Sequence, residues 1–437
     1  MIFILVILLL INLFICYNNF KYLISPPFVM NIGLLGASIV AALNYNNWGL
    51  DTFSEKTVFV VGGGAIWFTF CCILFSGKNK VRLKTHFKKE INFNNVNTKR
   101  IKTFLFLLIG LGFLTILVRI KVYASFFGSN LNVASLIWSV RENATVGSRE
   151  FVLPLFVKIP SIINSLVSYF TVWLLALQLH SKRRDKQLTL LFFSHIFVVC
   201  LDSILGGAKG GLVDLLSRFL FFYILIYYYK QQSIIFPRSL FYKLVILFCV
   251  CVLGFKSLNT MMGRPVEDEK SVDLFSIYCG AEIKNLDTYL QNTVNYGKSK
   301  YWGGTTFNNF YAYIGKTDND YGAIWEYYDG QMLGNVYTQF YPFHRDWGII
   351  GVFLILILIS LIVMFFYKKS IEKLFDNPII PSVYFVLYSA MYSHLFMSFF
   401  SSRFTEFTFH PGFLKLIIYV LIMRRLYISF FIRKKYD

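Results

Sequence analysis

Residues 352–367 read VFLILILISLIVMFFY and contain no charged side chain. Apolar runs of this kind, about 17 to 22 residues with their flanks, match the roughly 30 Å hydrocarbon core of a lipid bilayer. The preceding segment, GNVYTQFYPFHRDWGIIG (334–351), brings His344, Arg345 and Asp346 together at the mouth of the run. Trp, Tyr or Lys would be the usual residues there. This stretch therefore predicts a transmembrane helix and also raises the question of a functional site.

The composition of the whole chain agrees with a membrane protein. It has 437 residues, a mean hydropathy of +0.56, 19% aromatic residues and only 15% charged residues. A soluble domain of this size cannot bury so much apolar sequence. The first run, MIFILVILLLINLFIC (1–16), lacks a basic n-region and a small-residue cleavage site, so we expect a retained span. We predict an all-α polytopic membrane protein.

The apolar runs divide the chain into three parts. Residues 1–256 hold eight predicted transmembrane helices, residues 257–346 form one large loop, and residues 347–437 hold three more helices. The eleven predicted spans are 1–17, 27–44, 57–76, 101–119, 153–179, 188–205, 212–229, 240–256, 347–367, 379–399 and 412–431.

The basic residues of the loops predict an orientation. Residues 78–102 hold nine Lys/Arg against one Glu, and further basic clusters occur near Lys182, Lys230, Lys368 and the C-terminus. These clusters fall on alternate loops, which the positive-inside rule assigns to the cytoplasm. We expect a bacterial inner (plasma) membrane protein with its N-terminus in the periplasm and its C-terminus in the cytoplasm. The net charge of +20 then reflects topology and not nucleic-acid binding.

The predicted outer loop 257–346 has a different composition. It holds seven Lys/Arg, eleven Asp/Glu, eleven Tyr and two Trp, so its net charge is about −4. This balance argues against a polyanion partner held by bulk charge. The seven cysteines of the chain show neither a disulfide framework nor metal-ligand spacing, and no glycine-rich phosphate loop of Walker or Rossmann type occurs. We expect no metal and no cofactor.

Polar residues crowd the predicted outer face. His344, Arg345 and Asp346 lie at the outer end of the ninth span, and Arg218 lies roughly 9 Å inside the seventh. A charge inside a span is costly and is a functional candidate by default, although Arg218 could pair with Asp214 one turn earlier. The other candidates on this face are Arg141, Lys209, Arg264 and Arg403.

These residue types suit a lipid-linked diphosphate sugar. Arginine forks match diphosphate oxygens and can stabilise a leaving diphosphate without a metal. Aromatic rings pack on the C–H faces of sugars, and an imidazole can act as general base near neutral pH. Structural interpretations remain open beside each of these: His344 as an interfacial imidazole, Arg345–Asp346 as a pair that fixes the loop, and Lys209 in a solvated tight loop.

Four stretches carry a resemblance to a known family. They are SPPFVMNIGLLG (25–36), GGAKGGLVDLL (206–216), YCGAEIKNLDTYL with YWGGTTFNNFYAYIG (278–290 and 301–315), and GNVYTQFYPFHRDWGIIG (334–351). Together with the predicted spans and the one dominant loop, they resemble the Wzy-type O-antigen polymerases, also called oligosaccharide repeat unit polymerases.

The resemblance implies a GT-C-like membrane glycosyltransferase. Such an enzyme moves polymer from one undecaprenyl-diphosphate carrier to a new carrier-linked repeat unit in the periplasm. It implies arginines at the diphosphates and a His or carboxylate as the base, and a chain-length regulator as a partner. We therefore expect His344 as base, with Asp346 orienting it or the loop. The expected diphosphate ligands are Arg345, Arg218, Arg264 and Lys209, followed by Arg141 and Arg403.

Two other functions stay open at the level of sequence. An O-antigen ligase uses similar chemistry with a different acceptor and would also carry many spans and a large outer loop. A lipid-linked oligosaccharide flippase belongs to another class, and transporters usually show internal repeats with polar residues near the midplane. Here the polar residues crowd the outer ends of the predicted spans, which favours the enzyme. A capsule polymerase would give much the same sequence pattern.

Overall fold

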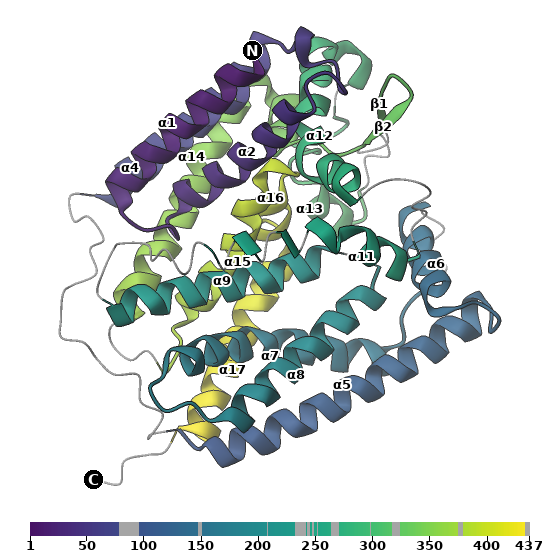
Figure 1. Ribbon diagram of the computed structural model, residues 1–437, viewed down its shortest axis with the longest axis vertical. Helices are drawn as coiled ribbons and strands as arrows, with labels where there is room; N and C mark the ends of the chain where they lie inside the picture. Colours follow the sequence, from purple (N-terminus) through teal and green to yellow (C-terminus); the bar gives the residue numbers. More distant parts are fainter. Residues whose placement is uncertain are drawn as a thin grey trace. The chain divides into compact units, whose positions relative to one another are not determined.

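The computed structural model is mainly helical. It describes residues 1–77, 96–146, 151–207, 209–231, 242, 245–246, 249–250, 252–263, 271–297, 299–316, 324–374 and 379–432. Within these residues, eight helices are long and apolar enough to cross a membrane, and the strands are confined to one short hairpin. The chain is therefore a polytopic membrane protein of almost entirely helical structure (Figure 1).

The eight helices overlap eight of the predicted spans. They are Ile2–Phe20, Pro26–Leu43, Glu55–Ser76, Thr98–Phe127, Leu155–His180, Lys186–Leu205, Gly210–Lys230 and Phe340–Glu372. A shorter apolar helical stretch, Val383–Phe399, coincides with the tenth predicted span. Pro411–Phe431 is helical as expected for the eleventh, but it carries three basic residues. Seven of the seventeen residues of the eighth predicted span, 240–256, lie outside the described residues. The total of eleven spans stays a prediction.

The chain divides into two compact units. Unit 1 comprises Met1–Leu83, Val272–Lys373 and Leu387–Ile418, and unit 2 comprises Lys84–Ser271, Leu374–Val386 and Tyr419–Asp437. The candidate residues divide in the same way. His344, Arg345, Asp346 and Arg403 belong to unit 1, while Arg141, Lys209, Arg218 and Arg264 belong to unit 2.

Unit 1 combines membrane helices with most of the predicted outer loop. Its helices and strands are α1 (Ile2–Phe20), α2 (Pro26–Leu43), α3 (Glu55–Val58), α4 (Gly64–Ser76), α12 (Ser271–Gln291), α13 (Asn308–Tyr313), β1 (Glu326–Tyr328), β2 (Gln331–Gly334), α14 (Phe340–Leu374), α15 (Val383–Phe396, in part), α16 (Arg403–Thr408) and the first part of α17 (Pro411–Phe431). A π-helical turn, Phe59–Gly63, joins α3 to α4. Short 3-10 turns lie at Leu50–Thr52, Thr293–Tyr296 and Met397–Phe399.

Hydrogen bonds between side chains join the first membrane helices of unit 1. Helices α1, α2 and α4 lie side by side (Figure 1). Asn12 of α1 donates to Asn31 of α2 at 2.7 Å, and Asn31 donates to Thr69 of α4 at 3.1 Å. Lipid is as apolar as leucine, so such bonds and close packing hold membrane helices together.

The predicted outer loop is fixed to the membrane helices of unit 1 through α12. The buried Asp287 carboxylate accepts from the Ser54 backbone N–H at 2.9 Å and the Thr57 hydroxyl at 2.7 Å, so it holds the start of α3. Asn285 donates to the carbonyls of Leu333 and Val336, so it holds the segment leading into α14. One helix thus positions both the hairpin and the beginning of α14.

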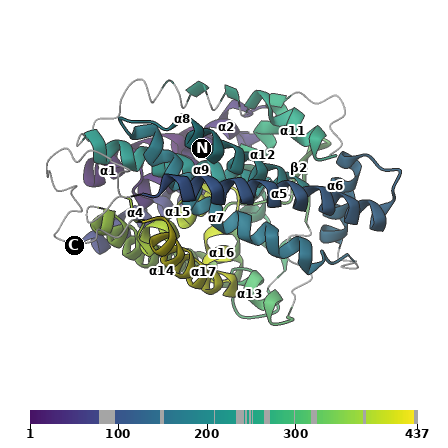
Figure 2. The same ribbon diagram turned by 90° about the horizontal axis from the view of Figure 1, so that it is seen from below.

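Unit 2 is a second group of membrane helices. It contains α5 (Thr98–Phe127), α6 (Val133–Val146), α7 (Leu155–His180), α8 (Lys186–Leu205), α9 (Gly210–Gln231), α11 (Phe255–Met261) and the remaining parts of α15 and α17. Helix α7 packs against α5, α8 and α9 (Figures 1 and 2).

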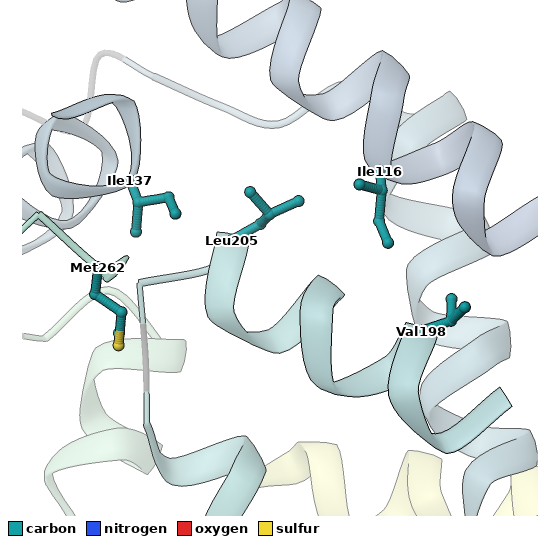
Figure 3. Close-up of a cluster of buried hydrophobic side chains, with 5 residues drawn as sticks. All are labelled: Ile116, Ile137, Val198, Leu205 and Met262. Carbon is teal, nitrogen blue, oxygen red and sulfur yellow. The ribbon is translucent and has the colours of Figure 1, made fainter. Parts of the chain in front are cut away.

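The interface of α5 with α8 is close and partly apolar. A Cβ on Gly112 of α5 would collide with Val198 of α8, so a small residue is needed there. Further along the same interface, Ile116 and Leu205 join Ile137 and Met262 in a buried cluster (Figure 3). This cluster links α5, α8, α6 and the end of α11.

Candidate functional site

The predicted triad lies on the first two turns of α14, in front of a break in the helix. Gly348 has φ 64° and ψ −158°, a backbone conformation that strains any residue with a side chain. The break separates the polar turns from the apolar run that follows. His344, Arg345 and Asp346 are consecutive, so their side chains leave α14 in different directions and make different contacts.

Asp346 holds the loop in front of α13. Its two carboxylate oxygens accept from the backbone N–H groups of Thr305, at 3.2 Å, and Thr306, at 2.7 Å. The neighbouring Gly303 has φ +65°, and a Cβ there would lie 2.7 Å from the Trp347 ring. No hydrogen bond joins Asp346 to His344 in the described chain. Of the two expected roles, the contacts fit orientation of the loop.

Arg345 is a buried cation, and the residues that the structure describes give it no counter-charge. The residue is only 8% exposed. Nε donates to the Gly297 carbonyl and Nη1 to the Tyr341 hydroxyl, both at a long 3.4 Å. Within the residues that the structure describes, no carboxylate lies within ion-pairing distance of the guanidinium. Burying an unpaired charge costs several kcal/mol, so a site of this kind is completed by an anion.

Four tyrosines with contacting rings lie beside Arg345. Tyr289 of α12 contacts the rings of Tyr296 and Tyr341 at centroid distances of 4.9 and 4.7 Å. Tyr337 stacks on Tyr341 at 4.4 Å. The four residues come from α12, the following 3-10 turn, the segment before α14 and α14 itself. We call this group the tyrosine cluster.

A buried glutamate organises the far side of the tyrosine cluster. Glu326 of β1 is only 9% exposed, and its Oε1 accepts from the hydroxyls of Tyr296 and, at 2.6 Å, Tyr337. Burial raises the pKa of Tyr289, Tyr296 and Tyr337, and the bonds to Glu326 raise it further for the last two. The phenols therefore stay protonated and act as hydrogen-bond donors at neutral pH.

His344 lies at the opposite edge of the cluster and is half-buried. Its Nδ1 is 3.0 Å from the Tyr289 hydroxyl, and the two rings meet edge to face at 5.5 Å. If Nδ1 carries the proton and donates to the Tyr289 oxygen, Nε2 keeps its lone pair and can accept a proton. The Tyr289 hydroxyl can also donate to Nδ1, so the tautomer of His344 depends on the direction of this bond, and only the arrangement in which Tyr289 accepts leaves Nε2 available as a base.

Together these groups can bind and process an anionic ligand. A guanidinium, protonated phenols, an imidazole and a carboxyl group lie within one network of contacts. Phenol O–H groups and a guanidinium donate to oxyanions, while an imidazole or a carboxylate can accept a proton. No group of three or more His, Cys, Asp or Glu residues in the described ranges has the geometry of a metal site.

The candidate residues of unit 2 have different surroundings. Arg218 of α9 is 3% exposed and pairs with Asp214 at 2.7 Å, one turn earlier, while its guanidinium stacks 3.8 Å above the Tyr169 ring. The alternative interpretation from the sequence, a local pair, therefore describes its geometry. Lys209 lies 4.0 Å above the Phe255 ring. Arg141 packs against Gly207 in the turn just before Lys209.

Two further candidates complete the set. Arg403, at the start of α16 in unit 1, is exposed and lies 3.7 Å from Glu406, a spacing at which surface pairs contribute little. Arg264 lies outside the described residues.

Sequence reasoning missed the tyrosine cluster and one ion pair. The spacing of Tyr337 and Tyr341, four residues apart on the approach to α14, was the available signal. Nothing in the sequence brings Glu326 and Tyr296 to them. In unit 2, Arg119 of α5 was also missed: it pairs with Asp202 of α8 at 3.0 Å and donates to Ser161 of α7 at 2.7 Å.

Comparisons of the chain with protein-family models, with curated proteins and with solved structures find no match. The functional argument therefore depends on the site and on the resemblance of the sequence stretches described above.

Proposed function

We propose that the protein polymerises undecaprenyl-diphosphate-linked oligosaccharide repeat units into O-antigen polysaccharide. The observation that carries the proposal is Arg345, a buried guanidinium without a carboxylate partner among the described residues and beside a cluster of hydroxyl donors. An anionic group is the ligand that completes such a site. The resemblance of GNVYTQFYPFHRDWGIIG to the polymerase family supports the choice of a carrier diphosphate as that anion.

The proposed reaction is a glycosyl transfer. A hydroxyl oxygen at the non-reducing end of the new repeat unit attacks the anomeric carbon of the polymer's first sugar. The new glycosidic bond forms as the bond to the carrier diphosphate breaks, and undecaprenyl diphosphate leaves with the electron pair. Arg345 and the phenol of Tyr341 would stabilise the negative charge that develops on the leaving group.

The base would take the proton of the acceptor hydroxyl. His344 remains the proposed base, with Tyr289 holding Nδ1 so that Nε2 is free to accept. Glu326 is the other carboxyl group in the network and would position the phenols of Tyr296 and Tyr337. Asp346 would keep the loop 303–306 against α14. Arg141, Lys209, Arg218 and Arg264 are kept in this proposal as diphosphate ligands, whereas Arg403 is left out of it, because its guanidinium is exposed and lies 3.7 Å from Glu406.

The membrane placement belongs to the same proposal. The protein would lie in the bacterial inner membrane with eleven spans, its N-terminus in the periplasm, its C-terminus in the cytoplasm, and residues 257–346 on the periplasmic face. The asymmetry of basic residues between alternate loops supports this orientation. A chain-length regulator would be a protein partner on that face.

The banding pattern of lipopolysaccharide from a deletion strain tests the function. The proposal expects lipid A–core carrying a single repeat unit, because flipping and ligation survive while polymerisation is lost. Bare core with accumulated carrier-linked polymer would identify a ligase instead. Bare core without any polymer would identify a flippase or an earlier step. Either of these two results would overturn the proposal.

Complementation of the deletion strain then tests the site. His344→Ala and Arg345→Ala should each fail to restore long polymer when the protein is present in the membrane at the normal level. Arg403→Ala is the matched control, since this exposed arginine has its own partner in Glu406. If both site variants restore normal polymer length and amount, the triad is structural.

A further inference from the structure

Residues 299–316 form a basic, aromatic segment within an acidic loop. The segment reads SKYWGGTTFNNFYAYIGK and contains two lysines, six aromatic residues and no Asp or Glu. The whole loop 257–346 has a net charge of about −4. A positively charged, aromatic segment within a negatively charged loop indicates a surface that binds something other than water.

The aromatic side chains of this segment are unusually exposed. Trp302 is 76% exposed, Phe310 40%, Tyr313 54% and Ile314 48%. Phe310 and Tyr313 belong to α13, Ile314 directly follows it, and Trp302 lies in the turn in front of it, which Asp346 holds through backbone bonds. The structure therefore presents these rings on a fixed scaffold. Exposed apolar patches of this kind mark an interaction surface.

Three lysine side chains lie beside two aromatic rings of this region, Tyr301 and Tyr313. The ammonium groups of Lys300 and Lys316 both lie 5.7 Å from the centre of the Tyr301 ring. Lys415, at the start of α17, lies 5.6 Å from the centre of the Tyr313 ring. All three lysines are exposed. Aromatic rings with lysines at their edges are typical of the layer of lipid headgroups, where the rings reach the acyl chains and the lysines meet phosphates.

The patch contacts the membrane helix α14 close to the start of its apolar run. Trp302 packs edge to face on Trp347 of α14 at 5.1 Å. Immediately beyond Trp347, Ile350 and Leu354 of α14 are 68% and 58% exposed. Trp302 therefore contacts α14 at Trp347, one residue before the break at Gly348 and three residues before the first of these exposed apolar side chains.

From these observations we infer that residues 299–316 lie in the headgroup layer of the bilayer that α14 crosses. Trp302, Phe310, Tyr313 and Ile314 dip toward the acyl chains, while Lys300, Lys316 and Lys415 contact lipid phosphates. The inference concerns a docking surface for lipid and does not depend on the proposed enzymatic function. It places the Asp346 loop, and with it the polar turns of α14, at the membrane surface.

Quenching of tryptophan fluorescence by brominated lipids tests the inference. The full-length protein is reconstituted into vesicles of phosphatidylethanolamine and phosphatidylglycerol with bromine near the top of the acyl chains. Trp302→Phe should lower the lipid-quenched part of the emission. Trp325→Phe is the matched control, because Trp325 is also exposed, at 49%, but lies beside Glu326 and Asp329 in the hairpin region. Its removal should leave lipid quenching unchanged.

A water-soluble quencher provides the complementary measurement on the same three proteins. Iodide should quench Trp325 and should not reach Trp302. If Trp302→Phe leaves lipid quenching at the wild-type level and removes part of the iodide quenching, the segment faces water or a soluble protein, and the inference fails. Both tryptophans are exposed, so substitution by phenylalanine should not disturb folding.

Discussion

Buried arginines have different kinds of partner in the two units. In unit 2, Arg119 and Arg218 are each almost fully buried, and each pairs with an aspartate within 3.0 Å. In unit 1, Arg345 is buried to a similar degree, yet its only described bonds go to a carbonyl and a phenol at 3.4 Å. The same residue type thus serves two purposes. The paired guanidinium of Arg119 joins α5 to α8, whereas Arg345, which has no carboxylate partner in the described residues, is the arginine that we propose for an anionic ligand.

The comparison also reorders the candidates from the sequence. The sequence predicts both Arg218, inside the seventh span, and Arg345, at the outer end of the ninth, as diphosphate ligands. The partner of Arg218 is Asp214, one turn away on α9, whereas the next residue after Arg345, Asp346, turns to the backbone of Thr305 and Thr306. Arg345 is therefore the stronger candidate for an anionic ligand.

The largest expected effect on stability is at Arg119. Arg119→Ala should cost about 3–5 kcal/mol of unfolding free energy, because Asp202 is left as a partly buried charge without its partner. The loss is measured by unfolding the purified variant and the wild type in detergent. The double variant Arg119→Met, Asp202→Leu should recover most of the loss, since it removes both charges. A single-variant loss below about 1 kcal/mol would contradict the structural role.

The largest expected effect on activity is at Arg345. Arg345→Ala should lower polymer formation by about 100- to 1,000-fold, the usual effect of removing one preorganised donor to a developing charge. Without a bound ligand the variant should be at least as stable as the wild type, because the change removes a buried charge and breaks no ion pair among the described residues. Arg345→Lys should recover only part of the activity, since a lysine lacks the fork. Polymer yield and unfolding are measured on the same preparations. A large loss of stability would mean that Arg345, like Arg119, has a structural role.

Glu282 extends the comparison from buried arginines to a buried carboxyl group, which can lose its charge by binding a proton. Glu282 of α12 is 2% exposed, and its Oε2 has no hydrogen-bond partner in the described chain. Burial raises its pKa well above the usual value. The unfolded chain therefore releases this proton at lower pH than the folded protein, and stability falls as pH rises above the unfolded pKa of about 4.3.

Glu282→Gln should consequently stabilise the protein at neutral pH and flatten that part of the pH dependence. At pH 4, below the unfolded pKa, the variant and the wild type should be nearly equal. Unfolding measured between pH 4 and 8 tests this. A variant that is less stable than the wild type at pH 7 would show that the Glu282 carboxylate is ionised and paired.

A smaller effect is expected at Tyr289. Tyr289→Phe removes the hydroxyl that contacts His344 Nδ1 and should cost about 0.5–1.5 kcal/mol of stability. Polymer formation should fall by more than that stability loss explains, because His344 is no longer held in one tautomer. The pH profile of polymerisation by the purified enzyme is the measurement. An unchanged profile would remove His344 from the role of base.

The smallest effect is expected at Arg403. This exposed arginine lies 3.7 Å from Glu406, and Arg403→Ala should change stability by less than about 0.5 kcal/mol. Polymer formation should stay within about twofold of the wild type. A large loss of activity would identify Arg403 as a diphosphate ligand. It would also weaken the distinction between arginines that pair with a carboxylate and arginines that bind a ligand.

The sequence predicted the helices better than the site. Apolar length alone located eight membrane helices, because a bilayer imposes that length on every span. It also located the polar turns of α14. The tyrosine cluster could not be found in this way, since Tyr289, Glu326 and Tyr337 come from separate segments that α12 and the hairpin bring together. Pairing of Arg218 with Asp214 was visible in the i,i+4 spacing, but spacing alone does not decide between a pair and a ligand.

Thermal unfolding with a diphosphate-bearing lipid tests the central claim most directly. The purified wild-type protein should be stabilised by geranylgeranyl diphosphate, by about 2.7 kcal/mol when the ligand is at 100 times its Kd. Arg403→Ala should respond like the wild type. Arg345→Ala should unfold cooperatively and show almost no stabilisation. Equal stabilisation of Arg345→Ala and the wild type would contradict the claim that this unpaired arginine binds the anion.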